Sequence, residues 1–322
     1  MAEPPPTGNS GHFTGGPGYP GQPAFPGGPD SPGWAGFPDP GDPLVPPPGA
    51  GLGVWWERCW SAARRGWRPL LSIVLLTQVL PTAAIGLAML PLQPRPPAVS
   101  PSGEPLPGEF EGFLGDLLPF LGILIAVSLV AGLVQCLGWA AGTWVITRQA
   151  TGQEAALGPA LRYGLRRAPG LFGWGLLASL LVLAGICACF LPGVYLAFAT
   201  SLVGPIYLFE RRDPIGRTFK MVHARFGMVL GRVAVVAAVV IGGGLVLAVL
   251  ESVMTLAPAA ATPGELSAPP AFSAVAVLST LVSAVLGAPL QLALLIGILI
   301  TYTEQRGHEA PVNSARLAAE LS

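Results

Sequence analysis

The sequence predicts an all-α, polytopic membrane protein with six transmembrane helices in three hairpins, each preceded by a basic amphipathic helix at the membrane interface. Hydrophobic residues make up 52% of the chain, charged residues 11%, and the mean hydropathy is +0.60. Soluble domains carry about 25% charged residues. This deficit indicates that lipid surrounds most of the chain. Two further observations agree: six long apolar runs are present, and they alternate with arginine-rich segments.

The first fifty residues differ from the rest in composition. Residues 1–50 are rich in proline and glycine and contain neither lysine nor arginine. Such a segment cannot bury enough apolar surface to offset the entropy of ordering. We therefore expect a disordered cytoplasmic tail, without the basic start and apolar core of a secretory signal peptide. Its scattered aromatic residues could bind a protein partner that recognises polyproline segments, although an inert tail is the simpler interpretation.

The six apolar runs are of a length to cross the hydrocarbon core, which is about 30 Å thick and needs about 20 helical residues. They predict a transmembrane domain over residues 51–304 and a short cytoplasmic tail over 305–322. Between the third and fourth runs, Pro192 and Gly193 predict a tight turn, because proline fixes φ and glycine tolerates conformations closed to other residues. The predicted crossings are residues 70–90, 117–146, 171–191, 194–209, 228–256 and 272–302.

Three arginine-rich segments precede the odd-numbered crossings and share one helical pattern. In residues 52–68, 151–168 and 213–226, apolar or small residues recur at i, i+4, i+7 and i+11, on one face of a helix. Asp213 can cap the third helix, and Pro214 suits its first position. An apolar face beside arginines is typical of a helix that lies in the headgroup region.

The distribution of charge predicts the orientation. Nearly all lysine and arginine residues lie before the first crossing, between crossings two and three, between four and five, and after six. The opposite side holds Arg95 against several acidic residues. Because cytoplasmic loops carry an excess of lysine and arginine, we expect a multi-pass protein of the cell membrane with both termini in the cytoplasm.

A proline-glycine turn followed by a basic helix carries a resemblance to a known family. The matching residues are the run from Leu191 to Leu196, Gly204-Pro205, Glu210, Pro214, Arg217, Phe219 and Arg225-Phe226. Over roughly residues 157–238 the chain resembles bacterial six-helix proteins named glycerophosphoryl diester phosphodiesterase membrane-domain proteins, and its composition looks actinobacterial. The resemblance implies the fold and the membrane location. It implies no activity, because no segment has room for the soluble phosphodiesterase domain of other members.

The three basic helices are the strongest functional signal. Near a membrane surface, each lysine or arginine contributes about 1 kcal/mol of attraction to anionic lipids. We hypothesise that a basic collar binds anionic headgroups; the same charges could instead only fix the topology, and both interpretations stay open. Nucleic acid is not an expected partner, because the charges are spread over short segments. The collar comprises Arg64, Arg65, Arg166, Arg167, Arg217, Lys220 and Arg225.

Glutamines inside the crossings support an alternative function. Gln78 lies one turn before Pro81, Gln291 follows Pro289, and Gln135 is in the second crossing. Polar groups beside helix-breaking prolines are typical of pathways in transporters. The alternative is therefore a small transporter or lipid exporter with a polar path through the bundle, although single glutamines also serve simply to join helices.

No pattern of residues predicts an enzyme, a cofactor or a metal site. Catalysis needs converging acids, bases or ligands, whereas His12 lies in the tail and His223 and His308 lie at the cytoplasmic surface. Cys187 and Cys189 lie in or beside an apolar run, where thiols usually only pack. We therefore predict a non-catalytic membrane protein with a structural or envelope-related role and membrane lipids as its partners.

Overall fold

The computed structural model describes residues 39–94, 106, 108–261 and 274–322, and every regular element in these ranges is a helix. Six segments are long and apolar enough to cross a membrane, which confirms an all-α protein with six membrane-spanning segments. The predicted disordered tail falls largely on residues 1–38, outside the described residues. The spans are Leu52–Leu92, Glu109–Ala150, Leu157–Ala188, Phe190–Glu210, Phe226–Met254 and Ala274–Glu309.

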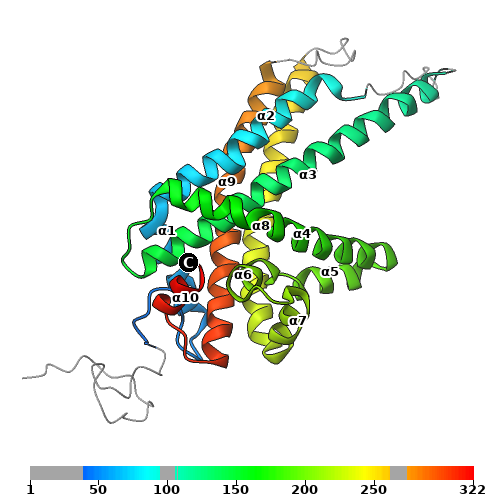
Figure 1. Ribbon diagram of the computed structural model, residues 1–322. Helices are drawn as coiled ribbons and strands as arrows, with labels where there is room; N and C mark the ends of the chain where they lie inside the picture. The colour runs from blue at the N-terminus through cyan, green and yellow to red at the C-terminus, as the bar shows by residue number, and fades with distance from the viewer. Residues whose placement is uncertain (1–38, 95–105, 107, 262–273) are drawn as a thin grey trace, which may run out of the picture. The chain divides into compact units, whose positions relative to one another are not determined.

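Consecutive spans pack side by side as hairpins (Figure 1). The first hairpin joins the continuous α1, η2, α2 and η3 to α3, the second joins α4 to α5 and α6, and the third joins α8 to α9. The elements are α1 (Leu52–Val74), π-helix η2 (Leu75–Val79), α2 (Leu80–Met89), 3₁₀-helix η3 (Leu90–Leu92), α3 (Glu109–Ala150), α4 (Leu157–Ala188), α5 (Phe190–Ala199), α6 (Val203–Glu210), α7 (Pro214–Ala224), α8 (Phe226–Ala261), α9 (Ala274–Glu309) and α10 (Ser314–Glu320).

The buried core lies where the C-terminal halves of α3 and α9 meet α1. Residues 140–147 of α3 and 295–305 of α9 are buried without interruption. Small residues allow this close approach, since a Cβ added at Gly138 would overlap Thr77 of η2 and one at Gly142 would overlap Leu295 of α9. The end of the bundle formed by α7, α10, the start of α4 and the end of α9 is rich in arginine; we call it the basic end.

Two of the three predicted interfacial helices are not separate elements. Residues 52–68 and 157–168 continue without a break into the first and third spans, whereas residues 214–224 form the separate helix α7. Pro69 and Pro169 lie inside α1 and α4, and neither is accompanied by a residue that ends the helix. A proline removes one backbone hydrogen bond, and the apolar run beyond it continues the helix. Asp213 caps α7 as predicted, accepting from the Gly216 amide at 3.2 Å.

The turn between the third and fourth spans is centred on Cys189, not on Pro192 and Gly193. Cys189 has extended backbone angles, φ −172° and ψ 150°, and α5 begins directly after it. Pro192 falls in the first turn of α5, where its missing N–H has no helical partner to lose. Gly193 serves close packing, because a Cβ there would overlap the backbone of Ile186 in α4.

Residues 39–50, assigned to the tail by composition, are instead packed against the helices. Leu44 and Val45 are buried, and the Asp42 carboxylate accepts four hydrogen bonds. Two come from the Leu44 and Val45 amides at 2.8 Å, and two come from the Ser314 amide and hydroxyl at 2.7 and 2.6 Å. Leu44 and Val45 therefore pack against the helices, and the neighbouring Asp42 carboxylate joins this segment to α10.

Replacing Asp42 should release this segment. Asp42→Ala leaves buried donors without an acceptor, and we expect a loss of about 2–3 kcal/mol of unfolding free energy. Proteinase K should cleave within residues 39–50 faster in the variant, as measured by mass spectrometry of detergent-solubilised protein. Asp39→Ala is the control, because within the described chain the exposed Asp39 side chain bonds only to the nearby Gly41 amide. Equal cleavage of wild type and Asp42→Ala would contradict the prediction.

A buried ion pair joins α8 to α9. Arg232 donates two hydrogen bonds to Glu304, each 3.1 Å long, and the side chains are 8% and 0% exposed. A third bond from Arg232 reaches the Ala50 carbonyl at 3.0 Å, and the guanidinium lies 5.9 Å from the centre of the Trp55 ring. One arginine thus holds α8, α9, α1 and the N-terminal segment together.

Glu304→Gln should be strongly destabilising, because it leaves the Arg232 charge buried without a counter-charge. We expect a loss of about 3–5 kcal/mol, measured by thermal or denaturant unfolding in detergent. The control is Glu309→Gln, which removes a partly exposed carboxylate from Arg217 and should cost under about 1 kcal/mol. Similar unfolding of the two variants would show that the buried pair has no special role.

Candidate functional site

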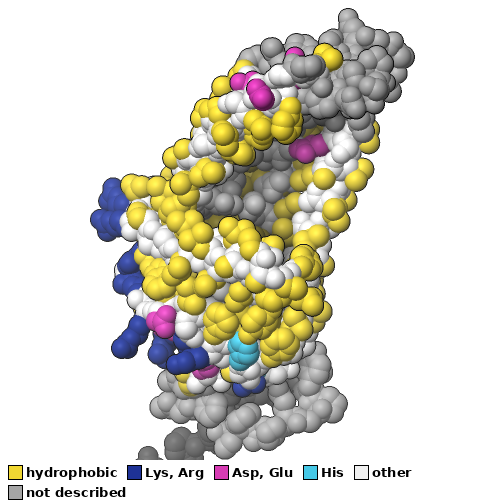
Figure 2. All heavy atoms as spheres, turned by 90° about the vertical axis from the view of Figure 1, so that its right-hand side faces the viewer, with side chains coloured by type: hydrophobic (Ala, Val, Ile, Leu, Met, Phe, Trp, Pro, Cys, Tyr) yellow, Lys and Arg dark blue, Asp and Glu magenta, His cyan; other side chains and the backbone are white. Residues whose placement is uncertain are grey.

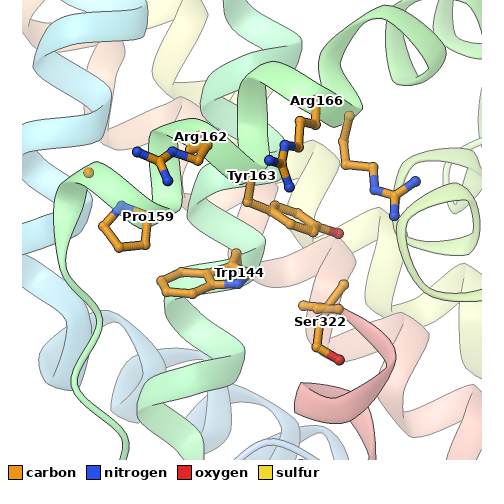
Figure 3. A pocket seen from close by; sticks show the side chains of 9 residues that line it. Trp144, Pro159, Arg162, Tyr163, Arg166 and Ser322 are labelled. Atoms are coloured by element: carbon orange, nitrogen blue, oxygen red, sulfur yellow. The ribbon is translucent and has the colours of Figure 1, made fainter.

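A pocket of about 580 Å³ opens at the basic end beside the first turns of α4. Arg162 and Arg166 lie one turn apart on α4, and Arg167 follows, so a single helix presents three guanidinium groups. Figure 3 shows Arg162 and Arg166 on the α4 side of the pocket, with Trp144 of α3 facing them. We call it the basic pocket; its lining is Trp144, Gly158, Pro159, Arg162, Tyr163, Arg166, Arg167, Leu321 and Ser322.

Aromatic rings form part of the wall of the basic pocket. The Arg167 guanidinium lies 5.9 Å from the centre of the Tyr163 ring, and Arg148 lies 5.1 Å from that of Trp144. The Tyr163 hydroxyl oxygen is buried and makes no hydrogen bond of good geometry with a described group. Tryptophan and tyrosine are enriched where membrane meets water. The pocket therefore combines positive charge with the side chains typical of the headgroup region.

The three arginines of the basic pocket, Arg162, Arg166 and Arg167, form no ion pair with a carboxylate among the described residues 39–94, 108–254 and 274–322. Arg217 of the predicted collar differs, since it donates to Glu210 at 2.7 Å and to Glu309 at 3.0 Å. Hydrogen bonds to Glu309 and Glu210 raise the pKa of Arg217 above its ordinary value. Arg217 is therefore paired with carboxylates of the protein itself, whereas the three arginines of the basic pocket form no ion pair with a described residue.

The remaining collar residues are exposed and lie on other elements. Arg64 stacks 4.9 Å from the centre of the Trp60 ring, and Arg65 donates to the Pro43 carbonyl at 3.0 Å. Lys220 and Arg225 are exposed at α7 and just beyond it. Figure 2 shows lysine and arginine side chains gathered along one edge of the molecule. These residues form a charged surface, whereas the basic pocket is the concave site within it.

A network of ion pairs joins the helices of the basic end, and the sequence did not predict it. Glu210 accepts from Arg217, from Arg306 at 3.4 Å and from the Tyr302 hydroxyl at 3.2 Å, and Arg306 also pairs with Glu320 at 2.9 Å. These bonds join α6, α7, α9 and α10. The sequence does contain an indication of these ion pairs, because Glu210 and Glu309 are carboxylates within otherwise arginine-rich segments.

The three glutamines of the alternative hypothesis line one pocket of about 190 Å³. Gln135 of α3 donates to Gln291 of α9 at 3.4 Å, and Gln78 of η2 lies on the same wall. We call this pocket the polar chamber; its hydroxyl-bearing lining residues are Thr77, Thr82 and Ser283. The π-helix arises just before Pro81, with the Leu80 amide donating to the Leu75 carbonyl, and such widened turns are frequent at functional sites.

The other polar groups singled out from the sequence do not converge. No group of three or more His, Cys, Asp or Glu residues is placed to hold a metal among the described residues. His223 contacts the Tyr195 hydroxyl at 2.8 Å and the Phe219 carbonyl at 2.6 Å, and Cys187 and Cys189 are free thiols on the exposed tip of the α4–α5 hairpin. Comparison of the chain with family models, curated proteins and solved structures finds no match. The resemblance described above stays a prediction.

Proposed function

We propose that this multi-pass membrane protein binds phosphate-bearing anionic headgroups in the basic pocket, and that membrane lipids are their source. The observation that supports the proposal is the set of three arginines, without carboxylate partners among the described residues, around one concave site. Guanidinium groups match phosphate oxygens in geometry as well as charge.

The position of the pocket favours a lipid over a soluble anion. Arg162 and Arg166 belong to the first turns of α4, and the same helix continues into an apolar span. A headgroup held there leaves its acyl chains beside exposed apolar residues of α4 such as Leu177 and Leu180. A free phosphate would gain binding free energy from the arginines, but it would make no contact with this apolar surface.

The exposed part of the collar has a supporting role in this proposal. Arg64, Arg65, Lys220 and Arg225 attract anionic lipids without enclosing them, and they bias the basic end toward the cytoplasm of a cell membrane. Binding requires no chemistry on the headgroup, so the role is structural or related to the cell envelope.

Removing two charges from the basic pocket should selectively weaken binding of anionic lipid. A guanidinium that hydrogen-bonds a bound phosphate contributes about 1.5–3 kcal/mol, against about 1 kcal/mol for an arginine that is only near the membrane surface. Arg166→Gln with Arg167→Gln should therefore reduce binding of phosphatidylglycerol by more than about a hundredfold. Native mass spectrometry of protein from nanodiscs containing phosphatidylglycerol and phosphatidylcholine measures the retained lipid. The charge-matched control is Arg64→Gln with Arg68→Gln, which removes two exposed arginines outside the pocket.

Two results would overturn the proposal. Equal loss from both double variants would show that the charges act collectively, as expected if they only orient the protein. Displacement of phosphatidylglycerol by inorganic phosphate at equal concentration would show that the acyl chains contribute nothing and that the pocket serves a soluble anion.

A further inference from the structure

The polar chamber contains more hydrogen-bonding capacity than its own residues use. The Gln78 amide makes no hydrogen bond with a described residue, and Gln135 and Gln291 share one bond between them. Each amide offers two N–H donors and an oxygen acceptor. In a membrane-spanning segment an unused polar group is costly and marks a functional site by default.

The chemistry of the lining selects a neutral ligand. The residues that line the chamber include three amides and three hydroxyls and none with a charge. The Thr77 hydroxyl donates to the Ile73 carbonyl at 2.8 Å, and the Ser283 hydroxyl donates to Glu251, which is outside the lining. Both oxygens can still accept. A group that donates and accepts at once, such as a hydroxyl, matches this wall better than an ion does.

An apolar groove of about 500 Å³ adjoins the chamber between α3 and α4. Gln135 lines both spaces, and Leu129, Phe172 and Leu176 form part of the groove. Figure 2 shows this side of the molecule hollowed, with hydrophobic side chains over most of the rim. A molecule with an apolar chain in the groove therefore meets the amides at one end of it.

We propose that the polar chamber binds the hydroxyl-bearing headgroup of a neutral lipid, with the lipid chain in the groove between α3 and α4. The headgroup hydroxyl accepts from and donates to the amides of Gln78 and Gln291, and Gln135 is the boundary between headgroup and chain. This site shares no residue with the basic pocket, so it stands or falls separately from anionic headgroup binding.

The test uses dioleoylglycerol as the probe in phosphatidylcholine nanodiscs. Native mass spectrometry measures how much dioleoylglycerol the full chain retains. Gln78→Met keeps the length of the side chain and removes the amide, and we expect about a tenfold loss of retained probe from the missing hydrogen bonds. Thr82→Val removes a hydroxyl with little change in shape and gives a second variant. Gln93→Met is the control, because Gln93 is exposed beyond η3.

A chemically capped probe separates headgroup recognition from filling of the groove. Dioleoylglycerol with its free hydroxyl converted to a methyl ether should be retained about tenfold less by the wild type and equally by wild type and Gln78→Met. In a thermal unfolding assay, the uncapped probe should stabilise the wild type more than Gln78→Met. Equal retention of capped and uncapped probe, or unchanged retention in both Gln78→Met and Thr82→Val, would overturn the proposal.

Discussion

The buried pair of Arg232 and Glu304 is the interaction on which the basic end depends. Both charges are almost completely removed from solvent, so each requires the other, and the geometry that satisfies both fixes α8 against α9. A further N–H of Arg232, on Nη2, donates to the Ala50 carbonyl, which positions the start of α1 and the docked segment before it. Trp55 completes the arrangement by covering the guanidinium and donating to Thr301 at 3.2 Å.

Arginine has two distinct roles at this end of the molecule. Arg217, Arg232 and Arg306 form ion pairs with carboxylates and so hold helices together. Arg162, Arg166 and Arg167 have no such carboxylate within the described chain, and they surround a concave site. The same residue type therefore serves structure in one place and offers charge to a ligand in another. Proximity to Glu210, Glu304 and Glu309 decides which role each arginine has.

The polar chamber differs from the basic end, because its polar groups are uncharged and lie among apolar spans. Gln135 and Gln291 satisfy part of each other's capacity across α3 and α9. Gly138 brings α3 close enough for Thr77 and Gln78 to reach the same space. On the Gln78 side the helix widens into the π-helix just before Pro81, whereas α9 continues as an α-helix through Pro289 beside Gln291. Retaining such a cluster costs stability, which is why we assign it to ligand binding.

The sequence by itself determined the helical class, the six spans and the basic segments, because composition and periodicity follow directly from burial in lipid. It also identified the three glutamines and Asp213 as a helix cap. Tertiary structure decided which arginines remain open, since ion pairs such as Arg217 with Glu309 join residues 92 positions apart. Tertiary structure also decided that the turn between the third and fourth spans is at Cys189 and that Asp42 holds residues 39–50 against the helices. Both depend on packing between elements, which the local sequence pattern does not encode.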